Sequence, residues 1–285
     1  MSGASWWPRR RLHPIEKVCS STAMLQAWHR GFTGERPGWG PTFAYDEARH
    51  LAAYRHALSL AAGKRVVDAG CGEGFGTQLL AAVATEVVGL DYSAEAIEYC
   101  RSAWRRPNLT FQQVDLTHAR TVAGGFDLVL NFQVVEHIRE PLPFLRVLRA
   151  LLAPAGHLLL TTPNRLMSFS DNPYHVREYT AADLGDLLTQ VFSRVTILGM
   201  HGNDTVRAFD RQRARAVRRI LRFDPLGLRH RLPRSVVQFA FARLAVLVRR
   251  RAGSAAGAPT ITPDDFHVNA EHLAEALDLV AQCEA

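Results

Sequence analysis

Long apolar runs are absent from this 285-residue sequence, since no stretch reaches the roughly 18 residues that a membrane-spanning helix needs. The first residues include a basic run with no apolar segment behind it, so we expect no secretory signal. Cysteine is scarce as well: the four cysteines lie far apart and form no CxxC pair. This spacing argues against a disulfide framework or a zinc site and predicts reduced thiols in a cytoplasmic protein.

Two common phosphate-binding loops are also missing, because the sequence contains neither G-x-G-x-x-G nor G-x-x-x-x-G-K-[ST]. Instead, VVDAGCGEGFGTQLL (66–80) places four glycines at alternate positions, after an apolar run that ends in an acid. Glycines allow a sharp turn and let a ligand lie against the backbone without a Cβ in the way. Such a turn at the end of the first strand is where an open α/β sheet binds its ligand.

Acidic residues are nearly absent from one segment. Residues 207–251 hold fourteen arginines against two acids, a local balance of +12 in a chain of net charge +7, so the remainder carries −5. We interpret the segment as a helical lid or dimerisation element between the last two strands, with its arginines solvated or holding a phosphorylated ligand. A peripheral membrane contact or a nucleic-acid contact is the alternative.

Strand-like and helix-like patterns alternate from residue 65 onward, which predicts a Rossmann-like, doubly wound α/β fold with a mostly parallel sheet and a helical insertion before the last strand. We expect strands at 65–69, 86–91, 109–115, 126–133, 157–163, 193–200 and 262–268. We expect helices at 45–62, 76–84, 93–104, 143–152, 181–190, 205–222, 235–250 and 272–282. The predicted organisation is an N-terminal cap (1–44), a core (45–202), the Arg-rich insertion (203–260) and a last strand with a C-terminal helix (261–285).

The segment DAGCGEGFG (68–76) resembles the first motif of class I S-adenosylmethionine (SAM)-dependent methyltransferases, which have a seven-stranded sheet, and further motifs follow in order. FDLVLNFQVVEHI (126–138) and LLAPAGHLLLTTPN (151–164) resemble the later ones. The resemblance implies SAM as cofactor and S-adenosylhomocysteine as product. The implied cofactor-binding residues are Asp68, Gly70, Cys71, Gly72, Gly74, Asp91, Tyr92, Asp115, Leu116, Asn131 and Gln133.

Individual roles follow from the same resemblance. Asp68 assists the turn and the methionine amino group, Asp91 takes the ribose hydroxyls, and Asp115 contacts the adenine amino group. Tyr92 lies against the adenine face. We expect Cys71 to be a small buried filler rather than a nucleophile.

The segment QVVEHI (133–138) resembles the E-x-x-E-H segment of metal-dependent RNA 2′-O-methyltransferases and of ubiquinone-biosynthesis O-methyltransferases. Glu136 and His137 fill two positions, His175 is placed like a downstream histidine, and Gln133 stands where a carboxylate is expected. We favour His137 as a general base positioned by Glu136, with His175 lining the acceptor pocket and no metal. In a second reading, these three residues hold Mg²⁺ or Mn²⁺. In a third, Glu136 and His137 only cap the helix that begins near Pro141.

The predicted function is a SAM-dependent methyltransferase that O-methylates a small molecule, with a sugar-bearing natural product or glycan precursor as the expected acceptor. NPYHVREYT (172–180) and GERPGWG (34–40) resemble segments of a bacterial subgroup that acts on such molecules. One alternative is a metal-assisted RNA 2′-O-methyltransferase that grips phosphates with the Arg-rich helices. The other is a SAM-binding protein without catalysis.

Overall fold

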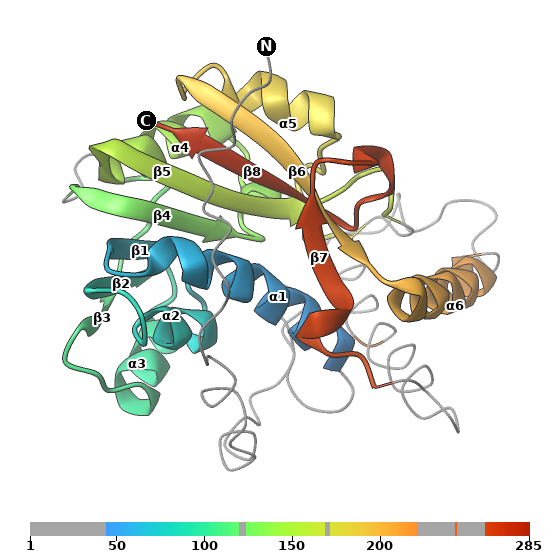
Figure 1. The fold of residues 1–285 in the computed structure, drawn as a ribbon, viewed down its shortest axis with the longest axis horizontal. Helices are drawn as coiled ribbons and strands as arrows, with labels where there is room; N and C mark the ends of the chain where they lie inside the picture. Colours follow the sequence, from blue (N-terminus) through green and yellow to red (C-terminus); the bar gives the residue numbers. More distant parts are fainter. Residues whose placement is uncertain (1–43, 120–123, 169–171, 222–242, 244–259) are drawn as a thin grey trace.

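An eight-stranded mixed sheet forms the centre of the molecule (Figure 1). The computed structural model describes residues 44–119, 124–168, 172–221, 243 and 260–285. The strand order is β3-β2-β1-β4-β5-β8-β6-β7; the first five strands run parallel, and β8 is antiparallel to both β5 and β6. The strands are β1 (Arg65–Ala69), β2 (Glu86–Asp91), β3 (Leu109–Gln113), β4 (Phe126–Phe132), β5 (Leu152–Pro163), β6 (Arg194–Gly202), β7 (Phe266–Asn269) and β8 (Asp278–Glu284).

Helices cover both faces of this sheet, which confirms the predicted doubly wound α/β architecture. The helices α1 (Ala44–Ala61), α2 (Phe75–Leu80) and α3 (Ala94–Ala103) share one buried apolar cluster. On the opposite face, α4 (Pro141–Leu151) and α5 (Ala181–Leu188) share the other cluster. Three short 3₁₀ turns complete the described elements: η4 (Val135–His137), η6 (Pro263–Asp265) and η7 (Leu273–Glu275).

Local sequence signals explain where the core elements begin. β1 and β2 are short apolar runs, and all their residues except the first in each strand are buried, as expected for parallel strands covered on both faces. The Ser93 side chain accepts from the Ala96 amide and caps α3, as predicted. α5 begins with a capping box between Thr180 and Asp183.

The predicted C-terminal helix at 272–282 is wrong. The chain forms the 3₁₀ turn η7 and then β8, which pairs along its length with β5 on one side and β6 on the other. Leu279, Val280, Ala281 and Cys283 are fully buried because β8 is central and covered on both faces. Alanine and leucine favour a helix locally, but a helix here would leave the edges of β5 and β6 unpaired. The short edge strand β7 corresponds to the strand predicted at 262–268, so β8 alone raises the count from the seven predicted strands to eight.

The described part of the Arg-rich insertion is the helix α6 (Asp204–Leu221), which confirms the helix predicted at 205–222. α6 packs against the start of α1: the Tyr45 hydroxyl donates to Asp210 at 2.6 Å, and the Tyr45 and Phe209 rings stack with centroids 5.1 Å apart. Within the described residues, no helix is long and apolar enough to cross a membrane. The predictions for residues 1–43 and for the helix at 235–250 lie outside the described residues.

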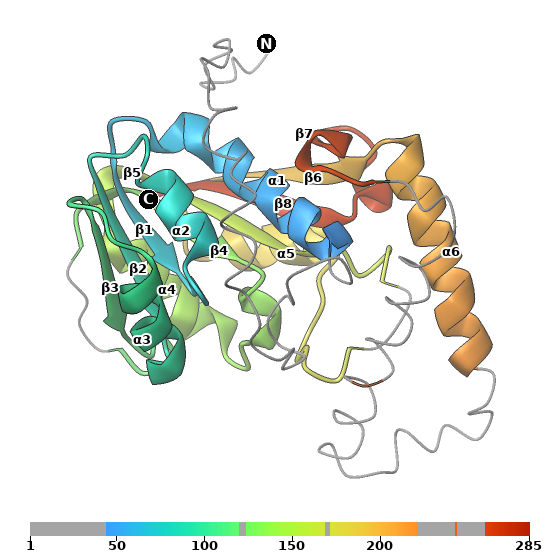
Figure 2. The same ribbon diagram turned by 90° about the horizontal axis from the view of Figure 1, so that it is seen from below.

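The predicted site residues lie at one edge of the sheet. β5 and β6 are both antiparallel to β8, so they run parallel to each other and to β1–β4. The carboxyl ends of β1, β2, β4, β5 and β6 therefore meet at the same edge. Figure 2 shows α6, which leaves the sheet after β6.

Candidate active site

The glycine turn after β1 has two glycines whose backbone faces the carboxyl edge. Gly70 (φ 92°) and Gly72 (φ 54°) both adopt positive φ, which side chains disfavour. A Cβ on Gly70 would lie 2.4 Å from Val134 Cγ2, so this glycine admits the loop after β4. A Cβ on Gly72 would meet no atom within 4 Å, so the backbone there borders open space. Gly72 is therefore the point where a ligand can approach the turn.

The other two glycines serve the packing of the protein. A Cβ on Gly74 would come within 2.8 Å of both Cys100 Sγ and the Phe111 ring. A Cβ on Gly76 would lie 2.0 Å from the Tyr54 ring. Cys71 is buried beside them, as predicted for a small filler. Its hydrogen bond to Cys100 and its burial raise the pKa of the thiol well above the usual value, which disfavours a nucleophilic thiolate. Only part of the alternate glycine pattern therefore concerns the cofactor.

Asp68 is the penultimate residue of β1, and its buried carboxyl has one oxygen without a hydrogen-bond partner. Its Oδ2 accepts from the Thr77 hydroxyl at 2.7 Å and from the Tyr54 hydroxyl at 3.0 Å. Its Oδ1 is buried without a hydrogen-bond partner. Burial raises the pKa of Asp68 to about 6, against the two hydroxyls, which lower it. A buried carboxylate oxygen without a partner fits a ligand ammonium group such as that of the methionine end of SAM.

Asp91 ends β2 directly beside the turn. Its Oδ2 accepts from the Gly72 amide and its Oδ1 from the Ser93 amide, each at 2.9 Å. Since each carboxylate oxygen can accept two hydrogen bonds, capacity remains for the two ribose hydroxyls that the resemblance assigns to this residue. Tyr92 follows and is 61% exposed, which leaves its ring face accessible to an adenine.

Asp115 and Leu116 follow β3 with different surroundings. Leu116 is buried in the apolar cluster shared with α4 and α5. Asp115 is half-exposed, and its carboxylate accepts from the Thr117 amide at 2.9 Å and the Thr117 hydroxyl at 2.6 Å, with His118 Nδ1 2.9 Å away. These hydrogen bonds lower the pKa of Asp115. In this structure Asp115 organises its own turn, and its contact with the adenine stays a prediction.

Asn131 and Gln133 leave β4 toward the same edge. The Asn131 amide donates to Ala69 O at 2.7 Å and ties β4 to β1. Gln133 adopts a positive φ of 57°, a strained backbone for a residue with a side chain. Its amide donates to Asp278 Oδ1 at 3.1 Å. Asp278 is buried at the start of β8 and forms a bidentate ion pair with Arg49 of α1. Gln133 thus joins a buried polar network instead of standing as an isolated cofactor ligand.

Glu136 and His137 form η4 directly after this strained turn. Glu136 is 1% exposed and accepts from the Thr162 hydroxyl at 3.0 Å. Burial raises the pKa of Glu136 to about 7. His137 Nδ1 lies 3.0 Å from the Tyr174 carbonyl oxygen. Since a carbonyl only accepts, Nδ1 carries the proton and Nε2 is the acceptor nitrogen of the ring.

His175 lies beside His137, with ring centroids 5.1 Å apart. Its Nδ1 donates to Glu178 at 2.6 Å, and its Nε2 lies 2.9 Å from Asn172 Nδ2. The Tyr174 amide donates to Asn172 Oδ1, which fixes the orientation of the amide with Nδ2 toward the histidine. Both ring nitrogens of His175 therefore have hydrogen-bond partners.

The segment that carries His175 is held over η4 by backbone contacts. The amides of Val176 and Arg177 donate to Glu136 O at 2.8 and 3.1 Å. The structure thereby brings Glu136, His137 and His175 together, with one potential ligand atom of each within 4.8 Å of the others. The third reading of this segment is wrong, because α4 has Glu140 at its N-cap position and no side-chain capping bond.

Sequence reasoning missed several residues that complete this edge. Tyr54 and Thr77 hold Asp68, and Asn172 and Glu178 flank His175 at three-residue spacing, a pattern that was visible in NPYHVREYT. Asp278 and Arg49 had no usable sequence signal, because they lie 229 positions apart and Asp278 was placed in a helix.

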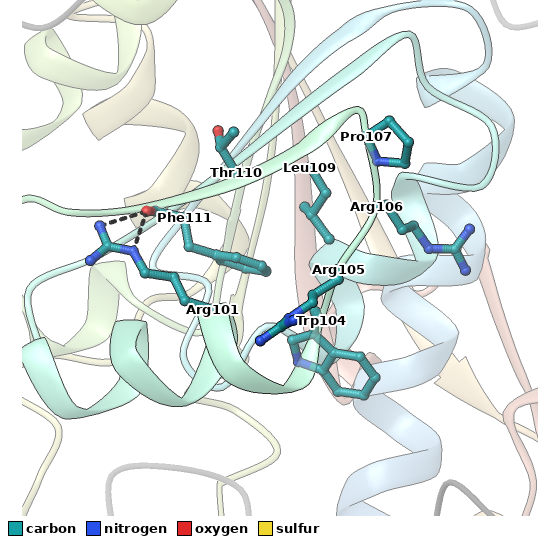
Figure 3. Close-up of a pocket in the computed structure, with 8 residues that line it drawn as sticks. All are labelled: Arg101, Trp104, Arg105, Arg106, Pro107, Leu109, Thr110 and Phe111. Carbon is teal, nitrogen blue, oxygen red and sulfur yellow. Dashed lines mark hydrogen bonds between the residues drawn. The ribbon is translucent and has the colours of Figure 1, made fainter.

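A separate hollow of ≈ 580 Å³ lies where α3 ends and β3 begins, away from this edge (Figure 3). Arg105 and Arg106 contribute to its lining, and Arg101 donates twice to Phe111 O. None of the predicted site residues lines the hollow. Two of its lining residues contact the glycine turn: the Trp104 indole donates to Glu73 O at 2.8 Å, and the Phe111 ring lies against Gly74.

A doubly wound sheet, an open glycine turn and two acids at the ends of β1 and β2 define the cofactor site of a class I methyltransferase. The methyltransferase-domain family matches residues 43–196, more than half of the chain, and the chain belongs to this family. It is a SAM-dependent methyltransferase.

Known relatives agree with this assignment. A probable SAM-dependent methyltransferase of Mycolicibacterium smegmatis is 38% identical over 180 residues, which cover 60% of this chain and 68% of the relative. A ubiquinone biosynthesis O-methyltransferase of Cereibacter sphaeroides is 36% identical over 105 residues, covering 36% of this chain and 42% of the relative. The chain therefore spans less than half of that relative's length.

The fold also matches solved structures. The SAM-dependent methyltransferase of Mesorhizobium loti has a TM-score of 0.50 at 17% identity, and the match covers 85% of this chain and all of that one. At this identity the likeness concerns the fold alone.

Proposed function

We propose that this methyltransferase transfers its methyl group to an oxygen of a small molecule, and that the acceptor is a sugar-bearing natural product or a glycan precursor. The observation that carries the proposal is the tautomer of the His137 ring. This residue lies at the carboxyl edge, and its hydrogen bond to Tyr174 O leaves Nε2 as the acceptor nitrogen. An imidazole held in this tautomer is suited to take a proton from a hydroxyl group.

Bound SAM supplies a methyl group on a sulfonium, which is already activated for in-line displacement. The protein has to align the acceptor and remove its proton, because a sugar hydroxyl is a weak nucleophile. His137 takes the proton at Nε2. As the ring becomes positive, its Nδ1–H bond to the Tyr174 carbonyl strengthens. Burial raises the pKa of the neighbouring Glu136 to about 7, so this carboxyl is partly protonated at neutral pH, and a positive charge on the His137 ring favours its ionised form.

His175 and its partners shape the acceptor side of the site. His175 is held by Asn172 and Glu178 with 14% of its side chain exposed, so its ring is fixed beside His137. The Val176 and Arg177 amides donate to Glu136 O, so the segment that carries His175 is bound to η4 at a fixed separation. A fixed wall next to the base restricts how an acceptor hydroxyl can approach Nε2.

A metal-assisted mechanism is the second candidate, favoured by the proximity of Glu136, His137 and His175 within 4.8 Å. Two features weigh against it. A divalent cation on His175 would have to displace Asn172 or Glu178 from the ring nitrogens. The set also contains one carboxylate, with Gln133 engaged by Asp278, and hard cations prefer several anionic oxygens.

The kinship with the ubiquinone biosynthesis O-methyltransferase supports oxygen as the acceptor atom. The shared region spans 36% of this chain, so the substrate of that relative is not transferred to it. The sugar-bearing class follows from the resemblance of NPYHVREYT to segments of the glycan-modifying subgroup.

Methyl transfer from labelled SAM tests the proposal. The acceptors are catechol, a phenolic acid, simple hexose glycosides and fractionated cell extract, and each product is examined for the methylated atom. We expect label on oxygen, and His137→Ala should lower kcat by about 10²- to 10⁴-fold, the usual contribution of a general base. His267→Ala is the matched control, since His267 is exposed on β7.

Chelation separates the two mechanisms. Activity that survives EDTA but is lost in His137→Ala supports the base. Loss of activity on chelation, with recovery on adding Mn²⁺, supports the metal. Label on nitrogen alone, or full activity in His137→Ala, would overturn the proposal.

A further inference from the structure

The exposed face of α6 is a stripe of positive charge. At about 100° per residue, Arg207, Arg211, Arg215, Arg218 and Arg219 fall within an arc of about 120° and along about 18 Å of the helix. All five arginines are exposed. Arg207 pairs with Asp204 at 2.9 Å, whereas the other four form no ion pair with any described residue.

The opposite face of α6 holds the helix against the body of the protein. Val206 and Ala214 are buried there, and Phe209 stacks on Tyr45. Arg213 forms an ion pair with Asp46 at 3.5 Å and lies over the Tyr45 ring. These contacts fix the rotation of the helix about its axis. The arginine stripe therefore faces away from the body of the protein.

A second, independent feature lies at the same edge. Among the described residues, the exposed large hydrophobic side chains are Tyr92, Leu166, Met167 and Val176. Tyr92 is assigned to the adenine. Leu166 and Met167 follow β5, with 57% and 37% of their side chains exposed, and Val176 is 43% exposed in the segment beside His137. The two segments run together, because Asn164 bridges to Tyr179 and the Arg165 amide donates to Tyr179 O.

Leu166, Met167 and Val176 form an apolar tip, which the buried side chain of Asn164 ties to the body of the protein. Its amide donates to Leu273 O and Ala276 O, and its Oδ1 accepts from the Leu166 amide. The tip follows β5 and α6 follows β6, so both leave the sheet at its carboxyl edge. The active site lies at that edge.

We propose that α6 and the apolar tip (Leu166, Met167 and Val176) form a docking surface for an anionic lipid bilayer. Arginines attract anionic headgroups, and a few exposed apolar side chains insert at the interface. The active edge then faces the membrane, where an acceptor carried on a lipid is presented to His137.

An RNA partner fits the surface less well. Single-stranded RNA is held by aromatic side chains that stack on its bases, and within the described part of α6 the one aromatic residue, Phe209, stacks on Tyr45. RNA phosphates offer no favourable contact to Leu166, Met167 and Val176, whereas a bilayer interface does.

Vesicle sedimentation tests the inference without any acceptor. We expect the full chain to bind vesicles of phosphatidylcholine mixed with phosphatidylglycerol, to bind pure phosphatidylcholine weakly, and to lose binding as salt rises. Since each arginine near an anionic surface contributes about fivefold, Arg211→Gln with Arg215→Gln should lower the partition about 25-fold. The matched control is Arg105→Gln with Arg106→Gln, which removes equal charge from the hollow of Figure 3 and should leave binding unchanged.

Two further measurements complete the test. Leu166→Ser with Met167→Ser should weaken binding to anionic vesicles, most visibly at high salt. Unchanged binding in this variant would show that the apolar tip does not take part in docking. SAM affinity by calorimetry should be equal in all variants, which shows that they fold. No binding to anionic vesicles, or an equal loss in the Arg105/Arg106 control, overturns the proposal. Binding of single-stranded or duplex RNA that is lost in the Arg211/Arg215 variant, without vesicle binding, assigns the stripe to RNA instead.

Discussion

The affinity for the cofactor should depend on pH through Asp68. Its Oδ1 is buried without a partner, and burial raises its pKa to about 6 in the free protein. The ammonium group of SAM or S-adenosylhomocysteine needs the ionised carboxylate. A free α-amino group has a pKa of about 7.7–8.0, so the ligand ammonium group stays protonated between pH 5 and 7, and Asp68 is the member of this contact whose charge changes in that range.

The magnitude follows from this pKa. One unit below the pKa of Asp68, at pH 5, about one protein molecule in eleven carries the ionised form, whereas at pH 7 nearly all do. The dissociation constant should therefore rise about tenfold from pH 7 to pH 5, which corresponds to about 1.4 kcal/mol. The affinity is lost as the pH falls, because binding favours the deprotonated state.

Calorimetry with S-adenosylhomocysteine at pH 5, 6 and 7 measures the effect, and Asp68→Asn is the control. The amide does not titrate, so its profile should be flat, and the loss of a charge-assisted bond should weaken binding by about 1.5–3 kcal/mol at pH 7. Tyr54→Phe removes one hydroxyl that lowers the pKa of Asp68 and should move the midpoint to higher pH. A flat profile in the natural protein, or a tenfold change that persists in Asp68→Asn, would refute the reasoning.

Four further outcomes are expected. Asp91→Ala should weaken SAM binding by about 1.5–3 kcal/mol in calorimetry, because it removes the ribose acceptor and the bond that holds the Gly72 amide. Gly76→Ala should lower the free energy of unfolding in urea by about 1–3 kcal/mol, since its Cβ would lie 2.0 Å from Tyr54; Gly185→Ala, whose Cβ would meet Ile197 at 3.9 Å, is the control. Asp278→Asn should cost about 3–5 kcal/mol in the same assay by leaving Arg49 unpaired. Iodoacetamide should label Cys71, Cys100 and Cys283 only after denaturation, as read by peptide mass spectrometry, because all three are buried and burial raises the pKa of Cys283 to about 12.

Sequence patterns predicted the parallel core well because its signals are local. β1 and β2 begin and end at the predicted residues, since each is a short apolar run between polar or glycine-rich turns. Ser93 caps α3 as expected for the same reason. The predicted end of α2 was late by four residues, because alanines continue a helical pattern without deciding where the chain turns.

The failure at β8 has a physical cause that sequence inspection does not reach. The segment HLAEALDLVAQ has good local helix formers, and its strand conformation depends on two neighbouring strands whose paired residues lie at least 78 positions away in sequence, as for Met200 and Asp278. Hydrogen bonds to β5 and β6 override local preference there. The same non-local pairing places Asp278, so the error in the fold and the missing site residue have one origin.

The site shows a similar division between local and distant information. The glycine turn, Asp68, Asp91 and the Glu136–His137 pair were visible as motifs, because each follows its strand directly. Two of the four glycines turned out to accommodate Tyr54, Cys100 and Phe111, which no spacing could reveal. The role of Gln133 also changed, since its amide is used by Asp278.

The buried network around Asp278 connects the cofactor side of the site to its acceptor side. Asp278 binds Arg49 of α1 and holds Gln133 in its strained turn, and that turn sets the start of η4, which carries Glu136 and His137. Val134, the next residue, packs against Gly70 of the cofactor turn. A shift of the strained turn would therefore move the base and the cofactor loop together. This shared support explains why a positive φ is retained at a residue with a side chain: relaxing Gln133 would separate the two halves of the site that methyl transfer must hold in line.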